Sequence, residues 1–375
     1  MIASWNHLPR RAGFALAAIA TAACATSAAT TAGAPVTVPS AGTTTAIAPQ
    51  PWASRTREHV DLWLHGYAML TRDSAHVPLF ARGYAPRMAA LKTQRNVFSQ
   101  LDANRERLTS ELAANPALVN GQFVPLYFPS WNDLRTEIDR FVQVDGNVNA
   151  TSDATERQYF AVLAASFPSP AMRDWVRLFA QSLDDEDKRF YHDYWTQAQR
   201  EHAATQQAFD SLWQRSWRPK LQRFLNNTQQ GNGELILSLP LDGEGRTISL
   251  GKAGNTVAVG FPDEPAAAVD AVYVFAHEAV NAITTTAIND NITPTQQRAG
   301  VGSDYAANAA VRGGAMLLQR AAPQLAAGYM RHYLAATGAT APSGDPTAAF
   351  TAAFPLPQVI LDAMSRQIDV VLGGI

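Results

Sequence analysis

The sequence predicts an α+β protein that is predominantly α-helical, with a helical N-terminal region, a small antiparallel β-hairpin sheet and a second helical part. Of its 375 residues, 47% are hydrophobic and 17% charged, which suits one large domain or two ordinary ones and excludes a disordered chain. Apolar residues recur at three- and four-residue spacing in most of the chain, as amphipathic helices require. Residues 234–261 instead form short β-branched runs between glycine-containing turns.

The first 24 residues have the pattern of a signal peptide, which predicts export to the cell envelope. Two arginines precede the apolar run 12–23, which is too short to span a bilayer. The only cysteine, Cys24, follows directly, and the segment resembles a bacterial lipobox with Thr21 at position −3. Three outcomes stay open: lipidation of Cys24, giving a membrane-anchored lipoprotein, cleavage by an ordinary signal peptidase, giving a soluble periplasmic protein, or plain anchoring of the chain by the uncleaved segment. A single cysteine excludes internal disulfides.

Residues 25–55 are rich in alanine, threonine, proline and glycine, a composition that predicts a flexible tether. Residues 56–230 are expected to form helices, with breaks near Asp184 and at Pro219. Ser169, followed by a proline, is a typical helix start. The net charge of −2 without a polybasic run argues against a nucleic-acid partner.

Residues 231–375 begin with three expected strands, 234–239, 247–250 and 256–261, which we predict to pair as antiparallel hairpins. A proline-flanked turn then opens a helix that runs past residue 280, and further helices follow. Asp304 is expected to cap one of them.

The helix after the strands contains Ala276-His277-Glu278-Ala279-Val280-Asn281, and with the hairpins before it this region resembles the zincin superfamily of metallopeptidases. In that family a His-Glu-x-x-His helix places two imidazoles on one Zn²⁺ while the glutamate activates the metal-bound water. The resemblance implies that His277 is a metal ligand and Glu278 the general base. Asn281 occupies the position of the second histidine, so the motif is a degenerate His-Glu-x-x-Asn and zinc binding is expected to be weak or absent.

The same resemblance implies a third metal ligand and an oxyanion-stabilising group further along the chain. No glutamate follows Glu278, so Asp304 is the candidate third ligand. Tyr305 and His332, with Tyr333 beside the latter, are the oxyanion candidates. Strand 256–261 would hold an extended peptide substrate by backbone pairing.

Structural roles compete with each of these assignments. Asp304 is also explained as a helix cap, His277 and Glu278 as ordinary helix residues, and His332 as part of an aromatic core. Two functions therefore stay open: an exported zincin-like protein, degenerate or inactive as a metallopeptidase, that acts on or binds peptides, or a non-catalytic envelope binding or scaffold protein. Metal content separates them, and Asn281→His is expected to restore zinc binding if the rest of the site persists.

One more pair of histidines stands on the long helical segment. His192 and His202 are ten residues apart, nearly three helical turns, which is too far for one metal ion. We therefore predict a solvated helix face there. The acidic run at residues 184–187 is expected to be a helix N-terminus.

Overall fold

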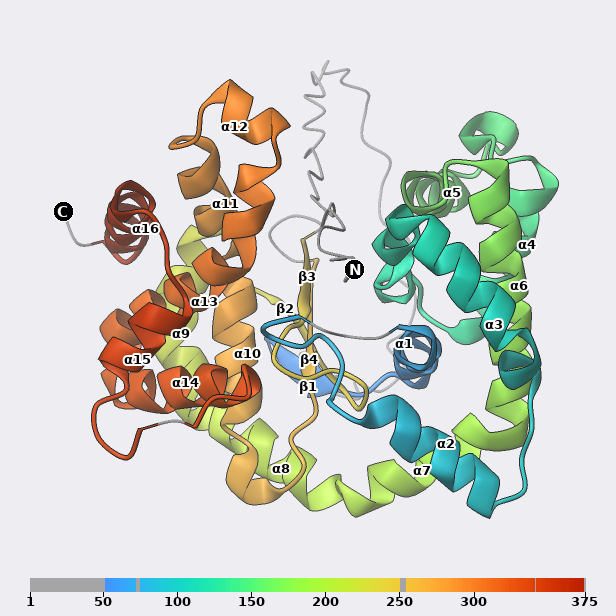
Figure 1. Ribbon diagram of the computed structural model, residues 1–375, viewed down its shortest axis with the longest axis horizontal. Coiled ribbons are helices and arrows are strands. Elements are labelled where there is room, and N and C mark those ends of the chain that lie inside the picture. The colour runs from blue at the N-terminus through green and yellow to red at the C-terminus, as the bar shows by residue number, and fades with distance from the viewer. Residues whose placement is uncertain (1–50, 72–74, 250–253, 341, 374–375) are drawn as a thin grey trace, which may run out of the picture.

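The computed structural model describes residues 51–71, 75–249, 254–340 and 342–373 (Figure 1). The expected signal peptide with Cys24, and nearly all of the expected tether, lie outside these residues. Helices make up 69% of the structure and strands 7%, so the predicted helix-dominated α+β class is confirmed.

Two groups of helices flank the strands of residues 233–260 in sequence. The first group is α1 (Glu58–Leu70), α2 (Tyr84–Gln94), α3 (Gln100–Ala114), α4 (Trp131–Gln143), α5 (Ala154–Ser166), α6 (Pro170–Glu186), α7 (His192–Glu201), α8 (Ala203–Leu212) and α9 (Arg218–Asn227). The second is α10 (Asp270–Ala279), α11 (Asn281–Asn289), α12 (Pro294–Arg298), α13 (Val301–Ala321), α14 (Pro323–Ala336), α15 (Thr347–Ala353) and α16 (Gln358–Val371). Ser169 caps α6 as predicted, since its side chain accepts a hydrogen bond from the Met172 N–H.

Two of the helix junctions are π-turns rather than breaks. The π-turn Asp187–Tyr191 joins α6 to α7, and the π-turn Trp213–Trp217 joins α8 to α9. The acidic run at 184–187 therefore ends α6 and enters the π-turn, so the prediction of a helix N-terminus there is wrong. In Figure 1, α7 and α8 run along the lower edge of the molecule from one helical group to the other.

The four strands of the described residues form one mixed sheet. They are β1 (Ala53–Arg55), β2 (Gly233–Ser238), β3 (Arg246–Ser249) and β4 (Asn255–Gly260), in the order β1-β2-β4-β3. β1, β2 and β4 are parallel, and only β3 runs antiparallel, along β4.

The predicted antiparallel sheet is therefore wrong, although the three strand positions were predicted within one residue at each end. The turn at Asp242 does not join neighbouring strands, because β2 pairs with β4 instead of β3. Instead, the segment around Asp242 forms backbone hydrogen bonds with the chain between α1 and α2. The Asp242 N–H donates to the Leu79 carbonyl, and the Ala81 N–H donates to the Pro240 carbonyl.

The end of the expected tether is also structured. Trp52 is fully buried, and its Nε1 donates to the Gln230 carbonyl at 2.8 Å. Ala53 pairs with Glu234 in the parallel register of β1 with β2. The tether prediction for 25–55 is wrong for these last residues, because one large aromatic side chain anchors them in the core.

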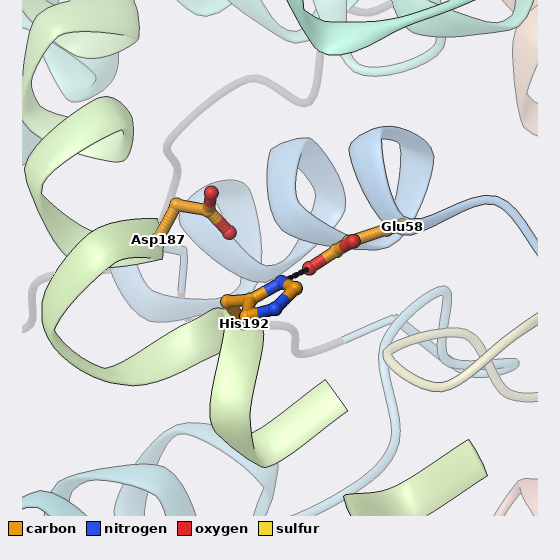
Figure 2. A group of neighbouring side chains, drawn as sticks. All are labelled: Glu58, Asp187 and His192. Atoms are coloured by element: carbon orange, nitrogen blue, oxygen red, sulfur yellow. Dashed lines mark hydrogen bonds and ion pairs between the residues drawn. The ribbon is translucent and has the colours of Figure 1, made fainter. Parts of the chain in front are cut away.

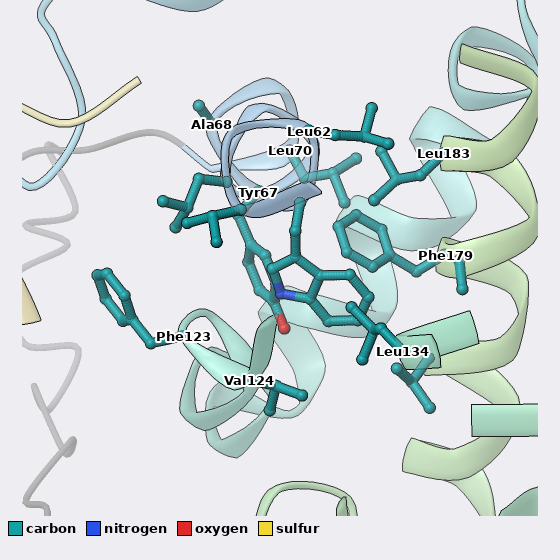
Figure 3. Close-up of a cluster of buried hydrophobic side chains, with 14 of the residues drawn as sticks. Leu62, Tyr67, Ala68, Leu70, Phe123, Val124, Leu134, Phe179 and Leu183 are labelled. Carbon is teal, nitrogen blue, oxygen red and sulfur yellow. The ribbon is translucent and has the colours of Figure 1, made fainter. Parts of the chain in front are cut away.

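The sheet separates two hydrophobic cores, and side chains alternate between them along each strand. Ile236 and Ala258 face the core of α1 to α6, part of which Figure 3 shows around Tyr67 and Phe179. Leu235 and Val257 face the core built by α8 to α16. Aromatic residues of α8 and the following π-turn belong to this second core, so the packing changes before residue 230.

One segment, Pro265–Asn289, is long and apolar enough to cross a membrane by length and composition. Within the fold it contains α10 and α11, and 67% of its most apolar window is buried against other parts of the chain. Such burial is typical of a core helix.

Candidate functional site

Helix α10, the next α-helix after β4, places His277 and Glu278 beside the sheet at its C-terminal end. The helix packs against β4 and β3 on the sheet face that carries Val257. His277 is 4% exposed and Glu278 3%, so both polar side chains are buried. Buried polar groups of this kind need hydrogen-bond partners within the protein.

Three donors within the protein bind the Glu278 carboxylate. Its Oε1 is 3.0 Å from His277 Nδ1 and accepts from the Gly245 N–H at 3.3 Å. Its Oε2 accepts from Asn281 Nδ2 at 3.0 Å. The Glu278 carbonyl in addition accepts from the Thr247 hydroxyl at 3.3 Å. Glu278 thus connects α10, α11 and the edge strand β3.

These partners explain the acidity of Glu278. Burial alone would raise the pKa of a carboxyl group. The hydrogen bond and charge of His277, the charge of Arg246 and the Gly245 N–H outweigh burial and hold the pKa of Glu278 below its ordinary value. The carboxylate is therefore ionised and bonded, which is the opposite of a carboxyl group poised to take a proton near neutral pH.

The imidazole of His277 faces the aromatic core. Its ring stacks on Tyr333 with centroids 5.5 Å apart, and the Tyr333 hydroxyl donates to the Gly243 carbonyl at 3.0 Å. Burial raises the pKa of Tyr333 well above its usual range, so the phenol stays neutral. His277 Nε2 is buried and has no hydrogen-bond partner among the described residues.

Asn281 does not continue the helix of His277. α10 ends at Ala279 and α11 begins at Asn281, with Val280 between them in a turn. The single helix expected through these positions is therefore interrupted, and the Asn281 side chain donates to Glu278 instead of lying beside His277 as a second ligand.

The later candidate residues do not join this group. α13 begins at Val301 after Gly300, which has φ +82°, so Asp304 lies exposed in the first turn and the predicted cap is wrong. Tyr305 packs against a separate small cluster with Ile288 and Met364. Among the described residues His277 belongs to no group of three histidine, cysteine or acidic side chains close enough to share a metal ion.

His332, on α14, lies beside the first residues of α10. Its Nδ1 is 3.6 Å from an oxygen of Asp270, and its ring packs on Tyr273 and Tyr333. His332 Nε2 is buried without a hydrogen-bond partner among the described residues. The structure thus brings together His277, Glu278 and Tyr333, while His332 contacts only the tyrosine of this set.

The strand expected to hold a peptide is internal. β4, which covers the expected strand 256–261, pairs with β2 on one side and β3 on the other, so its backbone groups are used within the sheet. β3 is the edge strand on that side. The prediction of a peptide-binding edge at 256–261 is wrong, because the chain before β4 folds back outside it.

A second group of ligand-type side chains lies on the other side of the sheet, where the sequence predicted only a solvated helix face. Glu58 from α1, Asp187 from the π-turn and His192 from α7 each offer an atom within 4.8 Å of the others (Figure 2). His192 Nδ1 is 2.7 Å from Glu58 Oε1. Sequence spacing could not have found this group, because Glu58 and His192 are 134 positions apart.

Comparisons of the chain with protein-family models, with curated proteins and with solved structures found no match. The residues and their geometry therefore carry the functional argument.

Proposed function

We propose that the chain is an exported envelope protein with a zincin-like scaffold that has lost metal-dependent catalysis and binds peptides without cutting them. The observation that carries this proposal is the state of Glu278. A general base in such an enzyme needs a free carboxylate oxygen facing a metal-bound water. Both oxygens of Glu278 accept hydrogen bonds from protein donors, and the carboxylate is buried.

The arrangement of sheet and helix supports the zincin-like part of the proposal. β4 leads into α10, and the antiparallel strand β3 lies at the edge of the sheet beside it. Zincins bind extended substrates by backbone pairing along such an edge strand, which gives β3 this role here. Glu278 fixes β3 to α10 through the Gly245 N–H and the Thr247 hydroxyl.

Export rests on the pattern of residues 1–24, and the anchor on Cys24. Labelling with palmitate in cells, for the wild type and for Cys24→Ala, tests the anchor. Loss of the label in the variant is expected for a lipoprotein, and an unlabelled, soluble wild type means a periplasmic protein instead.

The test of the proposed function combines binding with hydrolysis. Peptides retained from a random decapeptide library are resynthesised, and their affinity is compared with that of versions N-methylated at alternate residues. Strand addition predicts at least tenfold weaker binding of the methylated peptides, because they lack the N–H donors that pair with β3. No peptide is expected to be cut, with or without added zinc.

The zinc content of purified variants provides the matched control for the loss of the metal site at His277. In a His192→Ala background, which removes the second ligand group, the purified protein is expected to contain no stoichiometric zinc. Because Asn281 donates to Glu278 instead of lying beside His277, adding Asn281→His is expected to confer no zinc binding. Zinc-dependent cleavage that Glu278→Gln abolishes overturns the loss of catalysis, and zinc that Asn281→His gains and His277→Ala removes contradicts the loss of the metal site.

A further inference from the structure

We propose that Glu58, Asp187 and His192 form a binding site for one divalent transition-metal ion of the zinc type, with solvent completing its coordination (Figure 2). The three side chains come from α1, from the π-turn after α6 and from the first residue of α7. This site is on different elements from His277 and does not depend on the proposed peptide-binding function.

The distances suit an ion after small side-chain rotations. Zinc bonds to imidazole nitrogen and carboxylate oxygen at about 2.0–2.1 Å, which places tetrahedral ligand atoms about 3.4 Å from one another. Here the ligand atoms lie within 4.8 Å of each other, and the closest pair, His192 Nδ1 and Glu58 Oε1, is 2.7 Å apart. An ion between these two atoms would replace their hydrogen bond with two coordinate bonds.

The π-turn that begins at Asp187 brings the side chains of Asp187 and His192 toward the same side of the helix. Residues five apart on an α-helix point about 140° away from each other. In the π-turn the His192 N–H donates to the Asp187 carbonyl, the five-residue hydrogen bond that brings these two positions nearly in line. Single π-turns are rare and occur frequently at functional sites, because they cost stability relative to an α-helix.

The group also has unused ligand capacity. Asp187 Oδ1 is shielded from solvent and has no hydrogen-bond partner among the described residues. The neighbouring Lys188 forms its ion pair with Asp184 instead, with Nζ 2.6 Å from a carboxylate oxygen. A bound cation would satisfy the oxygen and remove the repulsion between the two carboxylates.

The donor set selects the metal. Calcium and magnesium prefer shells made of oxygen alone, whereas one imidazole with two carboxylates suits zinc and its neighbours in the first transition row. The His192 side chain is 60% exposed and the Glu58 side chain 30%, so water reaches the site and can fill the remaining positions. Three protein ligands with an open position are the pattern of metal sites that exchange a bound water for another ligand.

The test uses the full chain, stripped with a chelator and titrated with Zn²⁺ at neutral pH by calorimetry. We expect one ion per chain, and at least 100-fold weaker binding in His192→Ala and in Asp187→Asn. Asp193→Asn is the matched control, because Asp193 is the adjacent exposed acid and is not part of the group. His277→Ala should leave this zinc in place. Co²⁺ bound to the wild type should give absorption bands that His192→Ala abolishes.

Three results would overturn the site: no stoichiometric zinc in the wild type, equal loss in Asp193→Asn, or zinc that His277→Ala removes and His192→Ala does not. The last of these would also contradict the proposed function, whereas failure of peptide binding would leave the Glu58, Asp187 and His192 site untouched. Circular dichroism of each variant confirms that it is folded, and the partly exposed positions of His192 and Asp187 favour that outcome. Preference for Ca²⁺ or Mg²⁺ over Zn²⁺ would likewise contradict the assignment.

Discussion

Glu278 and Asp187 are both acids that lie beside a histidine, yet their environments are opposite. Glu278 is buried beside β3, and His277, Asn281 and a backbone N–H all bind it. Asp187 and its neighbours on α1 and α7 are partly exposed, and one oxygen of Asp187 has no partner among the described residues. The first group uses its hydrogen-bonding capacity for the fold, and the second keeps capacity for a ligand.

This difference teaches that a motif of ligand-type residues indicates a metal site only if its carboxylate oxygen atoms are not all already hydrogen-bonded within the protein. A carboxylate that holds three donors in a buried site connects elements, and removing it leaves those donors unpaired. A carboxylate with a free oxygen beside an imidazole is available to a cation. The following predictions test the contrast, beginning with the largest expected effect.

Glu278→Ala is expected to lower the free energy of unfolding by about 3–5 kcal/mol, the usual cost of removing one partner from a buried, hydrogen-bonded charged pair. His277, Asn281 and the Gly245 N–H would lose their acceptor together. Urea unfolding followed by circular dichroism measures the change. Glu58→Ala serves as the control, and a Glu278→Ala loss no larger than that of the control would show that the carboxylate has no structural role.

A second buried acid, Asp61 on α1, differs from Glu278 in being poorly bonded. Its Oδ2 accepts from Trp195 Nε1 at 2.9 Å, while its Oδ1 makes no hydrogen bond of normal geometry, although Ser238 and the Leu239 N–H lie nearby. Burial is the largest influence and raises the pKa of Asp61 to about 7. Glu278 and Asp61 are thus shifted in opposite directions by the presence and the lack of donors.

Because the pKa of Asp61 is raised and that of Glu278 is lowered, the two acids make the free energy of unfolding change with pH in opposite directions. The unfolded chain releases the Asp61 proton near pH 4, whereas the folded chain holds it to about pH 7, so stability should fall as the pH rises between these values. Asp61→Asn keeps the acceptor for Trp195 and removes the titration. The loss of unfolding free energy from pH 5 to pH 8 should be about 2–3 kcal/mol smaller in this variant than in the wild type. Parallel pH profiles of the two proteins would contradict the prediction.

The contrast between the two groups also shows what the sequence can and cannot predict. The positions of β2, β3 and β4 and the start of the helix after them could be predicted, because they depend on β-branched runs and turn residues only a few positions apart. Strand order is not local: β2 pairs with β4 because the segment between them bonds to the Leu79 region, which no pattern in residues 231–260 indicates. The burial of Trp52 is likewise a long-range effect.

The candidate sites follow the same rule. His277 and Glu278 could be recognised because they are adjacent, but the turn at Val280, which lets Asn281 donate to Glu278 instead of lying beside His277, could not. The partners of His192 were missed for two reasons. Glu58 is far away in sequence, and an Asp187 side chain five residues back is on another face unless the helix contains a π-turn.

The smallest expected effect is that of Glu58→Gln on the stability of the metal-free protein. The pair of Glu58 and His192 is solvent-exposed, and such pairs contribute about 0–1 kcal/mol. The free energy of unfolding of the variant should therefore lie within about 1 kcal/mol of that of the wild type when metal is absent.

Zinc at a hundred times its dissociation constant should stabilise the wild type by about 2.7 kcal/mol, because the ion binds the folded state, and should stabilise the variant less. Urea unfolding with zinc and with a chelator measures both quantities. A loss above 2 kcal/mol without metal would mean that this pair, like Glu278, serves the fold, and the contrast between the two groups would fail.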